Sequence, residues 1–191
     1  MLRRRPSRAV TGATVGFGIT AGLLAVVLVV VWASTSLTSN IRTGYKQWDM
    51  SVDNLSSEQV ENARTIIAVG RGADMSDRAI VIALMTAAQE SSLRNLDHGD
   101  RDSLGLFQQR PSQGWGEPDQ LQDPVWASKA FYGVNPEVRN PGLVQIRDWE
   151  DMEATDAAQA VQRSAYPQAY AKWEPLAEEV LSRHGAVEPI G

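Results

Sequence analysis

The feature that most constrains this chain is a run of 25 residues without a charged side chain, residues 9–33. As an α-helix this run would be about 37 Å long, which is enough to cross a hydrocarbon core of roughly 30 Å with some tilt. Four arginines precede the run, and the next positive charge after it is Arg42. The positive-inside rule therefore predicts a cytoplasmic basic tail at residues 1–8, a transmembrane helix at residues 9–33 and an extracellular remainder.

Two other interpretations of this run are a buried core helix and a cleavable signal peptide. A core helix of this length without one polar face is rare. Residues 31–33 resemble a weak small-residue cleavage site, but the run is longer than the usual 7–15 apolar residues of a signal peptide. We therefore favour a retained anchor, which makes the cytoplasmic membrane the first expected partner.

The net charge of the residues that follow the apolar run limits which kinds of molecule the domain can bind. Four of the 18 basic residues lie in the predicted cytoplasmic tail, and all 23 acidic residues follow the apolar run. Residues 34–191 thus carry 14 basic and 23 acidic side chains and a net charge of −9. A domain this acidic lacks the basic face that phosphate backbones need, so we expect no nucleic-acid partner. The chain has no cysteine, which excludes disulfides, thiolate metal sites and a cysteine nucleophile.

Beyond the apolar run the sequence predicts a short stalk and one mainly α-helical domain. Residues 34–54 are rich in Ser, Thr and Asn without a sustained period and form the predicted stalk, and residues 55–191 form the predicted domain. We expect the last helix to be kinked or broken near Pro175. No segment shows sustained strand alternation, although a short hairpin fits residues 95–110. Helix-start signals, either capping residues or a first-turn proline, occur at Ser56, Ser76, Asp123, Thr155 and Pro167.

Glu90 ends the helix expected from Ser76, and the two turns before it are almost entirely apolar. A glutamate on a helix is ordinarily a solvated surface residue. Here the apolar surroundings predict that the carboxyl group emerges from the core, where desolvation raises its pKa. The negative end of the helix dipole acts in the same direction. A carboxyl group that stays protonated near neutral pH is suited to act as a general acid.

The loop after this helix is rich in polar groups, but it does not have the pattern of a metal site. Asp97, Asp100 and Asp102 invite comparison with a calcium loop, yet no glycine stands at the sixth loop position with a glutamate six residues later. Neither His98 nor His184 has a ligand partner at helical spacing. We predict no metal ion and no cofactor, with the aspartates as solvated turn residues.

Three short motifs in a fixed order resemble the Glu-Ser, Gly-Leu-Met-Gln and Ala-Tyr-Asn motifs of the lytic transglycosylase and goose-type lysozyme superfamily. In this chain they are Glu90-Ser91, Gly105-Leu106-Phe107-Gln108 and Ala165-Tyr166. The wider blocks 89–96, 113–116 and 158–164 are similar to small secreted or anchored actinobacterial proteins of that type. The resemblance covers roughly residues 55–175. Phe107 stands in place of the family methionine, and Pro167 stands in place of the asparagine that follows the tyrosine.

The resemblance implies a lysozyme-like helical fold and cleavage of peptidoglycan glycan strands. Glu90 would be the sole acid and base. It would protonate the oxygen between N-acetylmuramic acid and N-acetylglucosamine and then deprotonate the muramyl 6-hydroxyl, which closes a 1,6-anhydro ring. The acetamido group of the substrate would replace a second carboxylate. Gln108 would line the groove and Tyr166 would orient Glu90, while Ser91 and Ser103 are supporting candidates.

Alternatives to this activity remain open at this point. A muramidase would add water instead of closing the ring, and Asp100 or Asp102 could hold that water. A non-catalytic wall-binding or assembly module would keep the fold and use the groove only to hold glycan. The net charge of −9 and the changed third motif give this alternative some support, although an enzyme is the preferred interpretation. Trp115 lies between two glycines of the loop, and its ring is a candidate either for stacking on a sugar or for the core.

Overall fold

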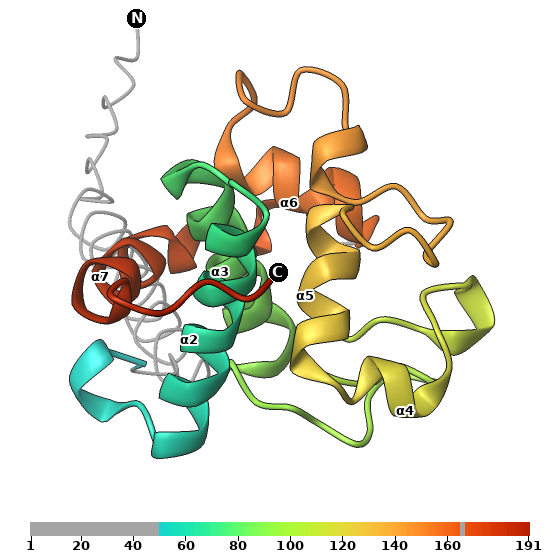
Figure 1. Ribbon diagram of the computed structural model, residues 1–191, viewed down its shortest axis with the longest axis horizontal. Helices are drawn as coiled ribbons and strands as arrows, with labels where there is room; N and C mark the ends of the chain where they lie inside the picture. Colours follow the sequence, from blue (N-terminus) through green and yellow to red (C-terminus); the bar gives the residue numbers. More distant parts are fainter. Residues whose placement is uncertain (1–49, 165–166) are drawn as a thin grey trace, which may run out of the picture. The chain divides into compact units, whose positions relative to one another are not determined.

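A buried helix, α3 (Asp77–Ser91), lies at the centre of the folded domain (Figure 1). Between residues 82 and 88 of this helix, no residue is more than 2% exposed. The helix that carries Glu90 is therefore buried, as the apolar turns before the acid indicate. The helices that pack against α3 are α2 (Ser57–Gly72), α5 (Pro124–Tyr132), α6 (Ala154–Gln162) and α7 (Glu174–His184).

This computed structural model describes residues 50–164 and 167–191. The predicted cytoplasmic tail, the predicted transmembrane helix and residues 34–49 of the predicted stalk lie outside the described residues. The folded unit spans Met50–Gly191, so residues 50–54 belong to it rather than to the stalk. There the 3-10 helix η1 (Val52–Asn54) packs against α7, and Val52 is buried. Across the described ranges, no helix is both long enough and apolar enough to cross a bilayer.

Three helices begin as their capping residues predict. The Ser56 hydroxyl accepts a hydrogen bond from the Gln59 amide (3.3 Å), and the Gln59 side chain accepts one from the Ser56 amide (2.8 Å). This is the predicted capping box of α2. Ser76 accepts a bond from the first turn of α3 at 3.3 Å, and Asp123 does the same for α5 at 2.8 Å. These side chains satisfy backbone N–H groups that a helix end leaves without partners.

The predictions for the start of α6 and for the loop after α3 need correction. α6 begins at Ala154 with Glu153 in the N-cap position, so Thr155 is the second helical residue, buried in the first turn, and not the cap. Residues 95–110 contain one isolated antiparallel bridge, between Leu104 and Gln109, instead of a hairpin. The described part of the chain has no strand, which confirms a mainly helical domain.

The chain after α6 is broken into short pieces, as predicted, but the break precedes Pro175. Two 3-10 helices, η4 (Pro167–Ala169) and η5 (Ala171–Trp173), come before α7. Pro175 lies in the first turn of α7, where a missing N–H costs nothing because no helical partner exists there.

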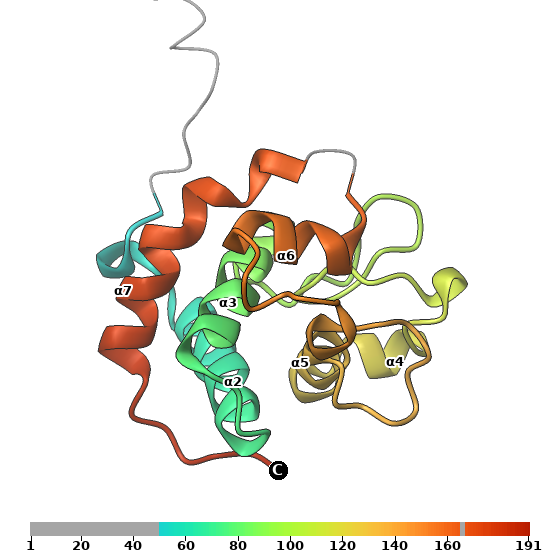
Figure 2. The same cartoon turned by 90° about the horizontal axis from the view of Figure 1, so that it is seen from above.

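The long helices surround one core. Figures 1 and 2 both show α7 on one side of α3, and α5 with the short helix α4 (Pro118–Leu121) on the other. Phe131 of α5 stacks on Phe107 with ring centroids 4.7 Å apart, and the buried Tyr132 hydroxyl donates to the Ile66 carbonyl (3.1 Å). Connections outside these helices include η2 (Pro111–Gln113) and η3 (Leu143–Gln145).

Candidate active site

Glu90 lies in the last turn of α3, half-buried, with the core behind it. Burial raises the pKa of its carboxyl group, and two hydrogen bonds, from Tyr170 and Gln162, partly offset that rise. Each bond favours the charged carboxylate, whereas desolvation favours the neutral acid. The apolar turns before Glu90 therefore have the electrostatic effect that the sequence predicts.

Tyr170 is a direct hydrogen-bond partner of Glu90. Its hydroxyl donates to Glu90 Oε1 at 2.7 Å, and the residue is fully buried. Burial, followed by the nearby Glu90 charge, raises the pKa of Tyr170 well above its ordinary range, so the hydroxyl keeps its proton. A Ser164 hydrogen bond to Tyr170 acts in the opposite direction. Tyr170 can therefore orient the acid but cannot compete with it for the catalytic proton.

Gln162, the last residue of α6, contacts both the acid and the second motif. Its side-chain amide donates to the Phe107 carbonyl at 2.8 Å, and the same side chain helps to lower the pKa of Glu90. The side chain thus joins α6, α3 and the loop that carries Gly105-Leu106-Phe107-Gln108.

Ser91 makes a second connection between Glu90 and that loop. Its buried hydroxyl lies 2.7 Å from the Leu106 carbonyl and 3.0 Å from the Ala87 carbonyl of its own helix. With one proton, the hydroxyl donates to one carbonyl at a time. The first and second sequence motifs are therefore adjacent in space. The Ser91 side chain binds the backbone of the loop 105–108 and is not exposed to a substrate.

Gln108 has a backbone conformation that is uncommon for a residue other than glycine, with φ of 48°. Its side chain folds back on its own loop, where the amide lies 3.3 Å from the carbonyls of both His98 and Gly105. A Cβ at Gly99 would lie 1.9 Å from Gln108 Oε1, so only glycine leaves room for this arrangement. The preceding Phe107 ring is 1% exposed and belongs to the core, not to a groove.

The turn after Glu90 is held by α2. Ser92 and Leu93 both have left-handed backbones, with φ of 56° and 60°. Gln59 donates to the Ser92 carbonyl at 2.8 Å, and Asn62 donates to the Leu93 carbonyl at 2.9 Å. Two side chains of α2 therefore fix the backbone immediately behind the acid.

Other residues predicted for the site are either buried in the domain or bound within their own loop. Ser103 is 6% exposed and Trp115 is 8% exposed, which places the Trp115 ring in the core, the second of its two predicted settings. The two carboxylate oxygens of Asp102 bind the Arg110 side chain (2.6 Å) and the Ser112 amide (2.8 Å). The Ser112 bonds, with a smaller contribution from Arg110, lower the pKa of Asp102. Asp102 therefore holds the loop together.

No described residues form a group of three or more His, Asp or Glu side chains that could hold a metal ion. His98 is exposed and lies 2.7 Å from Asp97, whose pKa this hydrogen bond lowers. The pair therefore makes a local surface contact.

Sequence reasoning missed Tyr170 and Gln162. Tyr166, the predicted orienting residue, lies outside the described residues, and the tyrosine found against Glu90 comes four positions later. The signal was present, because Ala169-Tyr170 is a second Ala-Tyr pair. Gln162 lies in the block 158–164 that carried the resemblance, but nothing in its spacing pointed to Glu90.

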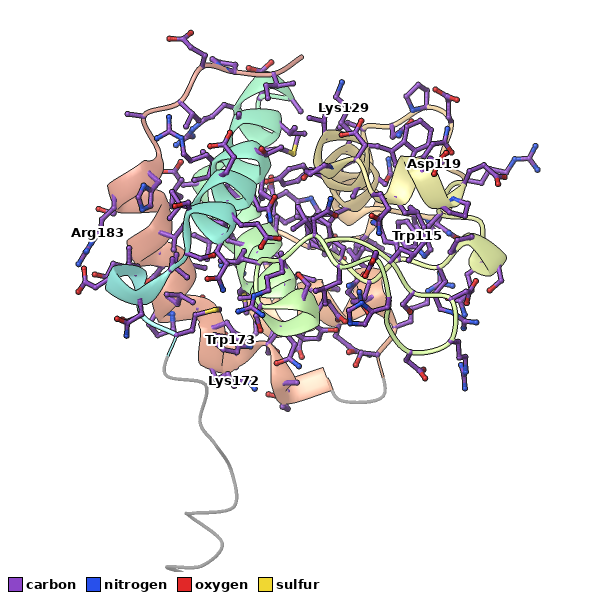
Figure 3. All side chains as sticks on the ribbon, turned by 90° about the horizontal axis from the view of Figure 1, so that it is seen from below. Trp115, Asp119, Lys129, Lys172, Trp173 and Arg183 are labelled. Atoms are coloured by element: carbon purple, nitrogen blue, oxygen red, sulfur yellow. The ribbon has the colours of Figure 1, made fainter. Side chains whose placement is uncertain are left out.

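Behind Tyr170, the indole N–H of Trp173 donates to Gln89 Oε1 at 2.9 Å. The Lys172 ammonium lies 5.0 Å from the centre of the Trp173 ring, and Figure 3 shows the two side chains together, well apart from Trp115. The segment that carries Tyr170 is therefore attached to the end of α3 at a second point.

Compared with known proteins, the chain matches no family model and no curated protein at a significant level. Its function is inferred from the chemistry of this site and from the motifs that meet there. A half-buried acid with a raised pKa, held by a neutral hydroxyl and an amide, can donate a proton to a bound substrate and take one back.

Proposed function

We propose that residues 50–191 form a lysozyme-like lytic transglycosylase domain that cleaves peptidoglycan glycan strands. The observation that supports this most directly is the setting of Glu90, whose pKa is raised by burial while the Tyr170 hydroxyl holds Oε1 at 2.7 Å. Ser91 and Gln162 bring the Gly-Leu-Phe-Gln loop to the same acid. The resemblance assigns substrate binding to that loop.

The proposed reaction is acid–base chemistry at one carboxyl group. Glu90 gives its proton to the glycosidic oxygen, so that N-acetylglucosamine leaves as an alcohol. The acetamido oxygen of N-acetylmuramic acid stabilises the positive charge at the anomeric carbon. The Glu90 carboxylate then takes the proton of the muramyl 6-hydroxyl, whose oxygen attacks that carbon and closes the 1,6-anhydro ring. Tyr170 and Gln162 stabilise the carboxylate between the two proton transfers.

The decisive experiment treats purified peptidoglycan with the full chain and identifies the soluble fragments by mass spectrometry. We expect 1,6-anhydro-muramyl ends. Reducing muramyl ends would indicate a muramidase instead, and binding without fragments from a folded protein across the pH range would indicate a wall-binding module. Either result would overturn the proposed activity.

Glu90→Gln tests the assigned acid. We expect at least a hundredfold loss of cleavage, the lower range of what a general acid contributes. The fold should persist, because the amide has the same shape and carries no charge. Glu61→Gln is the matched control, since Glu61 is an exposed glutamate on α2, and it should leave the rate unchanged. Equal rates for wild type and Glu90→Gln would remove Glu90 from the mechanism.

We also propose that residues 9–33 anchor the domain on the outer side of the cytoplasmic membrane, where peptidoglycan lies. The arginine cluster before the apolar run supports this orientation. A reporter that works only in the cytoplasm should be silent when fused after Gly191. Activity of that fusion would contradict both the topology and the substrate.

A further inference from the structure

A cavity of about 500 Å³ lies between the end of α2, the start of α5 and the segment that follows α7. This volume is in the range of small-molecule sites, which combine a mainly apolar lining with a few polar groups. Here the apolar part includes Val69 and Trp126, and the polar part includes Asp123, Asn135 and Glu137. The lining therefore has the composition of a ligand site.

The cavity is separate from the site at Glu90. Gln59, near the start of α2, binds the turn just after Glu90, whereas Val69 of the cavity lies ten residues further along the same helix. At 1.5 Å per residue this separation is about 15 Å. Figure 3 likewise shows Lys129, which lines the cavity, well apart from Trp173, which binds the residue beside Glu90. A small ligand in the cavity would therefore not contact the acid.

The segment after α7 forms one wall of the cavity and runs across the end of α2 (Figure 2). The Ile190 N–H donates to the Ala68 carbonyl at 2.9 Å, and Lys129 Nζ donates to the main-chain oxygen of Gly191 at 2.9 Å. A Cβ at Gly72 would collide with the Ile190 carbonyl oxygen, so glycine is needed for this close approach. The wall is thus held to both α2 and α5.

Trp126 gives the cavity an aromatic surface. The half-buried indole donates to the Trp115 carbonyl at 3.4 Å, and a Cβ at Gly116 would lie 2.9 Å from its Nε1. These two contacts hold the ring in one orientation. The C–H groups of a sugar ring can pack on such a face, because their partial positive charge complements the negative π-face.

The polar groups of the cavity match those of an acetamido group. Asn135 is only 9% exposed, its Oδ1 accepts from the Glu137 amide at 3.1 Å, and its NH2 group hydrogen bonds none of the described residues. Buried polar groups ordinarily have partners, so this NH2 group is suited to a ligand carbonyl. The Glu137 carboxylate can accept from a ligand N–H, and Asp123 has a second oxygen besides the one that caps α5. Two carboxylates also disfavour an anionic ligand.

We propose that this cavity is a second binding site, which takes an N-acetylated amino sugar. The sugar ring packs on Trp126, the acetamido oxygen accepts from Asn135, and the acetamido N–H donates to Glu137. That the sugar belongs to a wall glycan strand rests on the proposed function. The strand would then be held at a point away from the bond that Glu90 cleaves.

Binding is measured on the full chain, solubilised in detergent and labelled with 15N-tryptophan, with Trp126→Phe identifying the indole signal of Trp126. Triacetylchitotriose should shift this signal. Cellotriose and fully deacetylated chitotriose lack acetamido groups and should not shift it at the same concentration. Equal binding of cellotriose would remove the acetamido group from the recognition, and tighter binding of the deacetylated trimer would indicate a cation site. Either result would overturn the proposal.

Asn135→Asp keeps the oxygen that the Glu137 amide binds and removes the NH2 group. We expect triacetylchitotriose to bind about tenfold more weakly at Trp126, the effect of one hydrogen bond. Asn140→Asp is the matched control, because Asn140 lies on the same connection between α5 and α6 but binds the Gln113 carbonyl and does not line this cavity. Its affinity should equal that of wild type.

A Trp126 signal that ignores triacetylchitotriose would overturn the second site, even if Asn135→Asp failed to fold. Shifts confined to the Trp173 signal would do the same, since they would place the sugar at Glu90 alone. If wild type releases no fragments from peptidoglycan, the proposed function fails, while the Trp126 titration still decides whether the cavity binds the sugar.

Discussion

Opposing effects set the protonation of Glu90. Burial among the residues of α3 and its neighbours favours the neutral acid, while the Tyr170 hydroxyl and the Gln162 amide favour the carboxylate. A catalyst that must both give and take a proton needs neither form to be too stable. The donors around Glu90 therefore matter as much as the carboxyl group itself.

Tyr170→Phe removes the hydroxyl at 2.7 Å from Glu90 and keeps the ring in the core. The pKa of Glu90 should rise further, because the lost donor lowered it. The alkaline limb of the pH–kcat profile should then move to higher pH, and kcat should fall about tenfold. The profile is measured from the release of soluble fragments.

Tyr132→Phe is the control for this change, since Tyr132 is equally buried but donates to the Ile66 carbonyl. It should cost about 1 kcal/mol of stability and leave the pH profile in place. If both variants moved the alkaline limb of the pH–kcat profile by the same amount, the hydrogen bond from Tyr170 would not be what sets the pKa of Glu90.

The raised pKa of Glu90 also has a consequence for stability. In the unfolded chain the group titrates near its ordinary value of 4.5, and in the folded chain it titrates higher. A raised folded pKa contributes stability that is present below 4.5 and is lost as pH rises through the folded pKa. Relative to Glu90→Gln, wild type should therefore lose free energy of unfolding over that window in urea titrations. A pH-independent difference would contradict the burial of the charge.

At the scale of elements, the end of α3 is held by several side-chain-to-backbone hydrogen bonds. Ser92 and Leu93 turn the chain through left-handed conformations that cost about 1–2 kcal/mol each outside glycine. Gln59 and Asn62 of α2 bind the carbonyls of that turn, and Ser91 binds the loop 105–108. The strained backbone of Ser92 and Leu93 is stabilised by the hydrogen bonds that connect α2, α3 and the loop 105–108 at this point.

Ser91→Ala should separate α3 from the loop 105–108. It removes the bond to the buried Leu106 carbonyl, and an orphaned buried group costs about 1–3 kcal/mol. Thr86→Val is the control, because the Thr86 hydroxyl donates to the Ile82 carbonyl of its own helix, α3. Denaturant unfolding should show a larger loss for Ser91→Ala, with reduced cleavage in that variant alone. The opposite order would mean that the loop is held by other contacts.

The sequence predicts where these helices begin better than it predicts the tertiary contacts between them. The caps at Ser56, Ser76 and Asp123 depend on residues within three positions, and all three are confirmed. Glu90 was likewise predicted from the apolar turns beside it. Tyr170 reaches Glu90 from 80 positions away, through a contact that packing creates and that no local period indicates.

At the scale of the whole molecule, residues 50–191 fold around one core that every long helix shares. The buried cluster runs from Val52 to Val180 and has α3 at its centre. Without cysteine, stability depends on this core and on hydrogen bonds. The helices α2, α5, α6 and α7 cannot move away from this core without exposing residues of α3.

We therefore predict a single cooperative unfolding transition for the unit Met50–Gly191 within the full chain. Far-ultraviolet circular dichroism and tryptophan emission should give the same midpoint, and reducing agents should leave it unchanged. Two separate midpoints within this unit would show that one side of α3 unfolds independently of the other.

The bond between Trp173 and Gln89 also gives the protein an optical probe of its own. The indole N–H is tied to the residue beside Glu90, so a change of charge or a ligand at the acid alters the dipoles around that ring. Indole emission is sensitive to such dipoles, and the difference between wild type and Trp173→Phe isolates the signal of this one residue. Glycan binding could then be followed by fluorescence in the unlabelled protein, in real time and separately from bond cleavage.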